Sequence, residues 1–176
     1  MNPKLENNLY ELNLKLKDLF DDLDQKSEEQ LARPEEAGKW SINQVLVHLL
    51  TSERGSYQYI QKKMQSTEPF KKENVVSHMR YFALVTLLST PIKFKMPKKL
   101  KDPQSDLSYA EIRSDYVEVR NELEYFLKSF PEALVYSQIF KHPIAGRFSL
   151  PQMIKFLNFH FEHHMYQINR ISKKFD

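Results

Sequence analysis

Glycine is scarce in this chain, and that scarcity limits the folds that the chain can adopt. Its 176 residues include only 3 glycines but 9 prolines. Most of the prolines lie between segments with helical periodicity, where they end helices and stiffen the connections. Chains rich in β-hairpins need far more turn-forming residues than this. The pattern predicts an all-α protein built from long helices.

Length and composition favour one globular domain. The residues are 41% hydrophobic and 28% charged, as in ordinary globular proteins, and a chain of this length buries a core without disulfides. We therefore expect a single domain over residues 1–176. The apolar runs are too short to span a membrane, and Met1 to Glu6 lack the apolar core of a signal sequence. These features predict a cytoplasmic protein that does not enter a membrane.

Cysteine content and net charge narrow the chemistry. The sequence has no cysteine, which excludes disulfides, thiolate metal sites and cysteine nucleophiles. Any catalysis must use histidine, carboxylates, hydroxyls or a bound metal. The 26 basic side chains are nearly matched by 23 acidic ones, so charge does not point to nucleic acid or an anionic membrane as a partner.

Leucine spacing and capping motifs place the main helices. The leucines from Leu5 to Leu23 alternate at helical spacing and predict an amphipathic helix that stops before Pro34. Three further helices begin at capping boxes, in which a serine and a side chain three residues later satisfy amides at the helix start. These boxes are Ser41–Gln44, Ser108–Glu111 and Ser149–Gln152, with helices towards Gln65, Phe130 and Ser172. Four main helices with irregular connections predict a four-helix bundle.

The remaining segments are expected to be shorter or less regular. Residues 75–89 predict a more uniformly apolar helix, ended by Pro91 and buried in the core. The lysine-rich segment from Lys93 to Lys101 indicates a surface loop. Residues 135–140 suit a short strand or irregular chain. Residues 141–146 indicate a turn, because proline fixes one φ and glycine permits a positive one.

Two histidines of the last helix share its apolar face. At about 100° per residue, with His160 at zero, the apolar residues of this helix lie at roughly 20–120° and His164 at roughly 40°. An i,i+4 histidine pair places two imidazoles one turn apart, close enough to share a metal. The alternative is that both are buried polar residues hydrogen-bonded to neighbours.

A third ligand is expected from another helix, because bundles build metal sites from facing side chains. His48, in the second turn of the helix that begins at Ser41, is the best candidate. Three histidines leave coordination positions open for water or substrate, as catalytic zinc sites require. Considered alone, His48 is equally compatible with an ordinary exposed histidine.

The other histidines are not expected to be ligands. His163 falls at roughly 300° on the same wheel and is predicted to face solvent. His142 precedes a proline and is expected to organise the turn, and His78 has no partner in sequence. The last helix is not an HExxH protease motif, because Phe161 occupies the second position and Glu162 faces elsewhere.

Three motifs together resemble the DinB-like superfamily. They are Trp40 to Leu49, then His142 to Gly146, then His160 with His164 and Gln167, all within residues 40–170. The resemblance implies a four-helix bundle, often dimeric, with a divalent metal held by one histidine of the second helix and an HxxxH pair of the last. Those positions are His48, His160 and His164 in this sequence. The superfamily includes metal-dependent transferases of small thiols such as bacillithiol, isomerases that use mycothiol, and hydrolases.

Two functions therefore remain open. The first is a metal-dependent enzyme, a bacillithiol-type S-transferase or a small-substrate hydrolase, in which the metal makes a thiol or water nucleophilic. The second is a non-catalytic stress-response or interaction module with structural histidines. Imidazoles bind zinc, nickel, iron and copper alike, and zinc and nickel are our first candidates. A small thiol or electrophile is the expected partner, and the resemblance implies a homodimer. Nucleic-acid binding by Lys93 to Lys101 is disfavoured, since only Phe94 offers a stacking ring.

Overall fold

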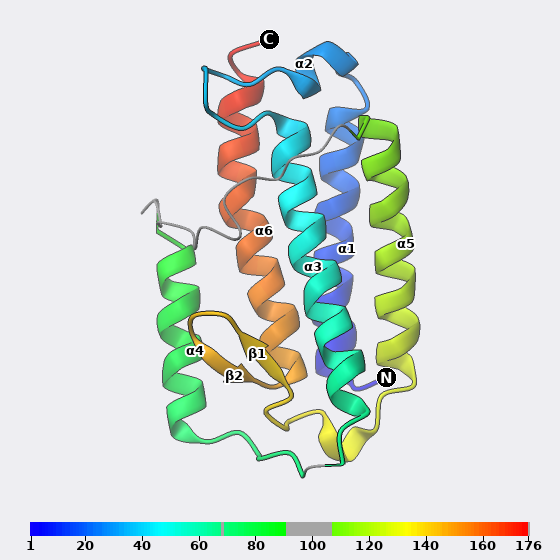
Figure 1. The fold of residues 1–176 in the computed structure, drawn as a ribbon, viewed down its shortest axis with the longest axis vertical. Coiled ribbons are helices and arrows are strands. Elements are labelled where there is room, and N and C mark those ends of the chain that lie inside the picture. The colour runs from blue at the N-terminus through cyan, green and yellow to red at the C-terminus, as the bar shows by residue number, and fades with distance from the viewer. Residues whose placement is uncertain (68, 91–106, 176) are drawn as a thin grey trace.

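Four long helices lie side by side and form the body of the molecule (Figure 1). The computed structural model describes residues 1–67, 69–90 and 107–175. The bundle consists of α1 (Pro3–Leu23), α3 (Ile42–Met64), α5 (Tyr109–Lys128) and α6 (Leu150–Ser172). The prediction of an all-α four-helix bundle is confirmed. The predicted loop from Lys93 to Lys101 lies outside the described residues.

The predicted capping boxes begin three of these helices. Before α3, the Ser41 hydroxyl accepts the backbone N–H of Gln44 at 3.2 Å, and the Gln44 side chain accepts the N–H of Ser41 at 2.9 Å. The same reciprocal pairs begin α5 at Ser108 and α6 at Ser149. Each pair satisfies amides that a helix start otherwise leaves without a partner. The helix starts were therefore readable from the sequence.

Shorter elements connect the bundle. The first helix stops before Pro34, as predicted, and ends at Leu23. A separate capping box at Ser27 and Gln30 then begins the short α2 (Glu28–Ala32). α4 (Val75–Leu88) follows α3, and a 3-10 turn (Glu132–Leu134) follows α5. Strands β1 (Phe140–His142) and β2 (Gly146–Phe148) form a hairpin before α6.

The core of the bundle lies between α1, α3, α5 and α6. α1 packs against α6 and α5, and α3 packs between α5 and α6. The predicted leucine face of α1 is buried, as are the inward residues of the other three helices. α3 thus has a neighbour on each side, and its two flanks reach different parts of the interior (Figure 1).

The hairpin contains a turn within the predicted residues 141–146, but only residues 143–145 form it. Its first strand begins at Phe140, the last residue of the candidate strand at 135–140. Phe140 pairs with Phe148 and His142 with Gly146 in an antiparallel register. Gly146 has a φ of +91°, which a residue with a Cβ rarely adopts. The Nδ1 of His142 accepts the backbone N–H groups of Ile144 and Ala145 at 3.2 and 3.0 Å. His142 therefore organises the turn, as the sequence suggested.

The buried position predicted for residues 75–89 is wrong. α4 stands outside the bundle, against α6 and the hairpin (Figure 1). Only Ser77 and Val85 of α4 are buried. The sequence signal was the absence of a polar face, which shows that a helix is suited to burial but does not identify the surface that covers it.

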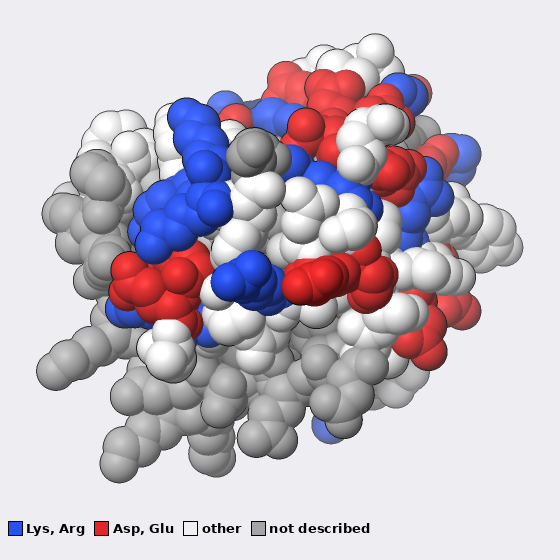
Figure 2. Space-filling model, turned by 90° about the horizontal axis from the view of Figure 1, so that it is seen from above, with Lys and Arg blue, Asp and Glu red and all other residues white. Residues whose placement is uncertain are grey.

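Acidic and basic side chains are mixed on the end of the bundle seen in Figure 2. At the C-terminal end of the chain, Arg170 donates to Glu35 through two nitrogens at 2.7 and 3.0 Å, and Lys174 donates to Glu36 at 3.2 Å. Among the described helices, none combines the length and the apolar character required of a membrane span.

Candidate metal centre

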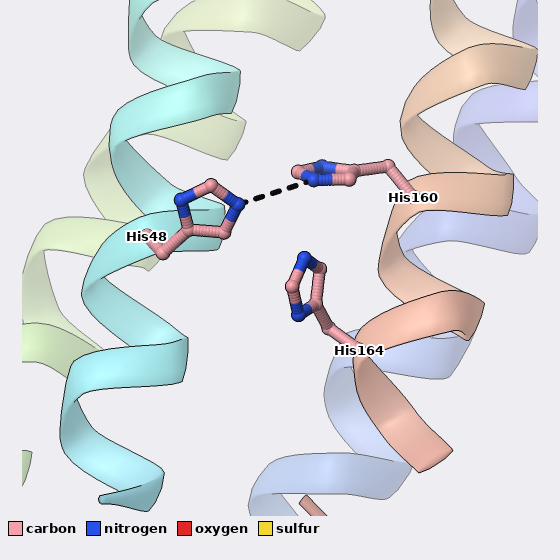
Figure 3. Close-up of side chains that lie close together, drawn as sticks. All are labelled: His48, His160 and His164. Atoms are coloured by element: carbon pink, nitrogen blue, oxygen red, sulfur yellow. Dashed lines mark hydrogen bonds between the residues drawn. The ribbon is translucent and has the colours of Figure 1, made fainter. Parts of the chain in front are cut away.

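Three histidine side chains from two helices meet between α3 and α6. His48 extends from the second turn of α3, and His160 and His164 extend from successive turns of α6 (Figure 3). The three rings point toward one another across the gap between the helices. The structure therefore brings together the three residues that the sequence predicted as a set.

Ring nitrogens face one another at short range in this cluster. The Nε2 atoms of His48 and His160 are 3.2 Å apart. One nitrogen from each of His48, His160 and His164 can be chosen so that all three lie within 4.8 Å of one another. The ring centroids of all three pairs are 4.8 to 5.1 Å apart. The cluster is a compact set of nitrogen donors and contains no carboxylate.

Burial keeps these imidazoles neutral. Desolvation lowers the pKa of His48 from 6.5 to about 4. It lowers the pKa of His164 to about 3, with a further contribution from His48. Burial followed by the neighbouring histidines, His164 first, lowers the pKa of His160 well below 6.5. A neutral imidazole has a free nitrogen lone pair, which is the form that binds a metal.

A neighbouring amide orients the ring of His164. Its Nδ1 lies 3.0 Å from the Oε1 of Gln167, one turn further along α6. An amide oxygen only accepts, so the Nδ1 of His164 carries the proton and donates it. The Nε2 is then unprotonated and available as a ligand. Metal-binding histidines commonly have such a partner on the second ring nitrogen.

Aromatic rings pack against the histidines from both helices. The Trp40 ring, just before α3, lies 5.3 Å from the ring of His48 between centroids. The Phe156 ring stacks on His160 at 5.5 Å and an interplanar angle of 16°. Because Phe156 is buried, it shields one face of His160 from water. These rings restrict the imidazoles to few orientations.

The donor set and its spacing fit a small divalent metal. Zinc held by imidazole nitrogens at about 2.0–2.1 Å in a tetrahedron places neighbouring nitrogens about 3.3–3.4 Å apart. The 3.2 Å separation of the His48 and His160 Nε2 atoms is close to that value. Without a metal, one proton at most can lie between these two nitrogens, and the cluster has only this hydrogen bond within it. Three neutral nitrogen donors also suit nickel.

The other histidines lie outside this cluster. His78 contacts Gln152 at 3.3 Å and pairs with Glu73 at 3.4 Å. The solvent-facing position predicted for His163 is wrong in one respect: the side chain is half-buried, and its Nδ1 lies 3.1 Å from the carbonyl oxygen of Leu88 at the end of α4. His163 thus links α6 to α4.

Sequence reasoning missed one neighbour of the cluster, Phe156. Its signal was available, since Phe156 precedes His160 by four residues and therefore shares its face of the helix. The sequence prediction for this helix did not include Phe156. In the structure the Phe156 ring contacts two histidine rings: it stacks on His160 and meets the ring of the hairpin residue His142 edge to face at 4.7 Å.

Fold and site together define a class of protein: a helical bundle with three clustered histidines from two of its helices. A sequence model of the DinB superfamily matches residues 13–168, and the chain belongs to that superfamily. The uncharacterised protein YuaE of Bacillus subtilis is 22% identical over 150 residues, which cover 85% of this chain and 88% of YuaE.

A solved structure shares the fold. YfiT from Bacillus subtilis, described as a probable metal-dependent hydrolase with an unusual four-helix bundle topology, superposes with a TM-score of 0.63. The match covers 99% of this chain and 89% of YfiT at 17% sequence identity. At that identity the similarity establishes the common bundle and does not by itself transfer the activity.

Proposed function

We propose that the protein is a metal-dependent enzyme in which His48, His160 and His164 hold one divalent ion. The observation that carries the proposal is the convergence of three neutral nitrogen donors from α3 and α6, with two Nε2 atoms 3.2 Å apart. Membership of the DinB superfamily and the description of YfiT as a probable metal-dependent hydrolase support the same conclusion. Zinc and nickel are the first candidates for the ion.

Three protein ligands leave coordination positions free. When bound there, the ion supplies a Lewis acid that makes a water molecule or a small thiol nucleophilic near neutral pH. The histidines hold the ion, and burial keeps them unprotonated. Gln167 fixes the His164 ring through its Nδ1, and Phe156 excludes water from one face of His160.

The reaction class that we propose is attack by this nucleophile on a small electrophilic substrate. With water the outcome is hydrolysis, and with a bacillithiol-type thiol it is S-transfer. The chain has no cysteine to act as nucleophile, so a thiol would have to be external. Small thiols are kept reduced in the cytoplasm, which is where we place the protein.

Turnover by metal-loaded protein tests this proposal. Chelated protein would be reloaded with zinc or nickel and supplied with bacillithiol, glutathione, cysteine or water as nucleophile against a panel of small electrophiles. We expect activity that disappears on chelation, returns on metal addition and is absent from a variant lacking all three histidines. Product analysis distinguishes the thiol adduct from the hydrolysis product.

The alternative is a non-catalytic interaction module with structural histidines. The mutual packing of the three imidazole rings, at centroid distances of 4.8 to 5.1 Å, is the observation that favours it. It would be preferred if no combination of metal and nucleophile gave turnover above the triple-histidine variant. In that case the histidines would contribute packing, and replacing them by leucine or phenylalanine would leave the bundle folded.

A further inference from the structure

The histidines of the cluster are not all held in place in the same way. The Nδ1 of His164 donates to Gln167 at 3.0 Å, so a hydrogen bond fixes that ring. His160 directs its Nε2 toward the Nε2 of His48. In the part of the chain that the structure describes, no hydrogen bond engages the Nδ1 of His160. Metal-binding histidines commonly have a partner on that second nitrogen. The orientation of His160 therefore depends on packing.

An aromatic ring provides this packing contact. Phe156 lies one turn before His160 on α6, and its ring stacks on that of His160 with centroids 5.5 Å apart and planes 16° from parallel. Ring pairs at such distances attract one another in preferred orientations. The His160 ring cannot turn about the bond to its Cβ without losing the stack. The direction of its Nε2 lone pair is therefore coupled to the position of the Phe156 ring.

The hairpin in turn fixes the Phe156 ring. The His142 ring meets it edge to face at 4.7 Å, and the Phe140 ring stacks against it at 6.3 Å. Both residues are buried members of β1, on the face of the strand that points inward. His142 makes the closer of the two contacts. Three rings thus form a series from the hairpin to the cluster, in the order His142, Phe156 and His160.

His142 is itself firmly held. Its Nδ1 accepts the backbone N–H groups of Ile144 and Ala145, so the neutral ring carries its proton on Nε2. Burial lowers the pKa of His142 to about 4, which keeps the ring uncharged near neutral pH. The ring also lies 6.0 Å from that of Phe148 on the opposite strand. Two hydrogen bonds and a neighbouring ring make His142 a rigid support.

We propose that His142 is a positioning residue for the metal ligand His160 and acts through the ring of Phe156. The proposal rests on the metal centre of the proposed function and adds the hairpin to it. The turn requires a side-chain acceptor at position 142, which an asparagine would also supply. The imidazole adds the ring contact with Phe156, which an asparagine lacks. The hairpin thereby influences how tightly His160 binds the ion.

Two substitutions separate the turn from the ring. His142→Asn keeps an acceptor for the turn and removes the ring, whereas His142→Phe keeps a ring against Phe156 and removes the acceptor. In calorimetric titrations, zinc affinity should fall about 3–10-fold for His142→Asn, the range expected for loss of one aromatic contact. It should remain within about twofold of the wild type for His142→Phe. The matched control is Ile144→Ala, in the same turn at a side chain that is 74% exposed; it should keep the wild-type affinity.

A double-mutant cycle tests whether His142 acts through Phe156. Phe156→Leu alone should lower zinc affinity about 3–10-fold, because the stack on His160 is lost. Adding His142→Asn to that variant should have no further effect, since the ring that His142 supports is absent. Additive losses in the double variant would show that His142 acts by another route and would overturn the proposal.

The metal-free protein provides a readout that does not depend on metal binding. The face of the Phe156 ring shields the ring protons of His160, so their NMR resonances report the stack. His142→Asn should shift these resonances toward their values in Phe156→Leu, and His142→Phe should leave them close to the wild type. If the wild type bound no metal, the proposed function would fail, and this NMR comparison would still decide whether His142 positions His160.

Three further outcomes would overturn the proposal. They are an unchanged zinc affinity in His142→Asn, an equal loss of affinity in His142→Asn and His142→Phe, and His160 resonances that His142→Asn does not shift. An equal loss would mean that the turn bonds matter and the ring does not. Circular dichroism of all the variants should match the wild type, which restricts the comparison to folded protein.

Discussion

α3 carries polar side chains into the interior on both of its flanks, and the two groups are built differently. On the side of α5, Glu53 forms a buried ion pair with Arg120. On the side of α6, His48 faces His160 and His164. Both groups lie within the same bundle and five residues apart on the same helix. They differ in charge: the first group joins two opposite charges, and the second brings together three neutral rings.

The ion pair is neutral as a unit. The Nε of Arg120 contacts one carboxylate oxygen of Glu53, its Nη2 donates to the other at 3.1 Å, and its Nη1 donates to the Oδ1 of Asn13 at 2.8 Å. The opposite charges cancel, and each carboxylate oxygen lies against a guanidinium nitrogen. Glu53 is 4% exposed and Arg120 5%. The group connects α1, α3 and α5.

The histidine cluster has no charged partner. It contains three neutral rings and one internal hydrogen bond, between the Nε2 atoms of His48 and His160. One ring nitrogen of each histidine lies within 4.8 Å of the other two, and the Nδ1 of His164 donates to the side chain of Gln167. Comparison of the two flanks shows that burial of polar groups does not by itself mark a site. The flank on which neutral ring nitrogens face one another is the one suited to bind a metal ion.

The largest expected effect on stability comes from breaking the buried ion pair. Arg120→Met should lower the free energy of unfolding by about 3–5 kcal/mol, because it leaves the Glu53 carboxylate buried without a partner. Urea unfolding measures this loss. Metal binding by the folded fraction should be unchanged.

Two comparisons make that experiment specific. Arg54→Met removes an ion pair to Asp115 between the same two helices, but one that is more than a third exposed on both partners, and should cost at most about 1 kcal/mol. The double variant Glu53→Leu with Arg120→Met should regain most of the lost stability. A loss of 1 kcal/mol or less for Arg120→Met would mean, on this scale, that the buried pair contributes no more than a surface pair.

Low pH should destabilise the protein through the histidine cluster. The folded pKa values of His48 and His164 are about 4 and about 3, below the ordinary 6.5. Between pH 6.5 and 4 the unfolded chain therefore binds protons that the folded chain does not, and the stability of the metal-free protein falls as the pH falls through that range. Unfolding curves at several pH values measure the slope. A His48→Leu/His164→Leu variant should show a shallower fall, and an identical fall would contradict the assignment.

The contact that orients His164 should have a smaller effect. Gln167→Leu removes the acceptor at its Nδ1, and metal affinity should drop about 10–100-fold because the ring loses its fixed tautomer and orientation. Calorimetric titration with zinc measures the change. Tyr166→Leu, at a neighbouring residue that is 78% exposed, serves as control and should keep the wild-type affinity.

The smallest expected effect is a gain. Gly55 lies on the same face of α3 as His48, and a Cβ built on it meets no atom within 4 Å. Gly55→Ala should therefore raise the free energy of unfolding by about 0.5–1 kcal/mol, since glycine is unfavourable within a helix. Metal affinity should be unaltered. A loss of stability would show that this flank of α3 requires the glycine.

The fold and the histidine set could be predicted because their signals are local. Capping boxes and the i,i+4 spacing of His160 and His164 lie within single turns of helix. The helical wheel then gave the direction of both rings. Even His48, on another helix, could be proposed because facing helices are where bundles place their ligands.

The rest depends on contacts between distant residues. Glu53 and Arg120 are 67 positions apart, and neither has a sequence neighbour that reveals the pair. The exposure of α4 was missed because an apolar helix has the same sequence pattern whether the rest of the chain covers it or leaves it at the surface. His163 was predicted to face solvent because a helical wheel of α6 carries no information about where α4 lies. Its partner in the structure, the carbonyl oxygen of Leu88, belongs to α4.

Metal binding by untagged protein tests the central claim most directly. The chain has a single tryptophan, Trp40, whose ring lies 5.3 Å from that of His48, so its fluorescence should be quenched as nickel or copper binds. Elemental analysis should give one divalent ion per chain for the wild type and for His163→Ala, and almost none for His160→Ala or His164→Ala. Full metal content in His164→Ala, or loss of metal in His163→Ala alone, would contradict the assignment of His48, His160 and His164 as ligands.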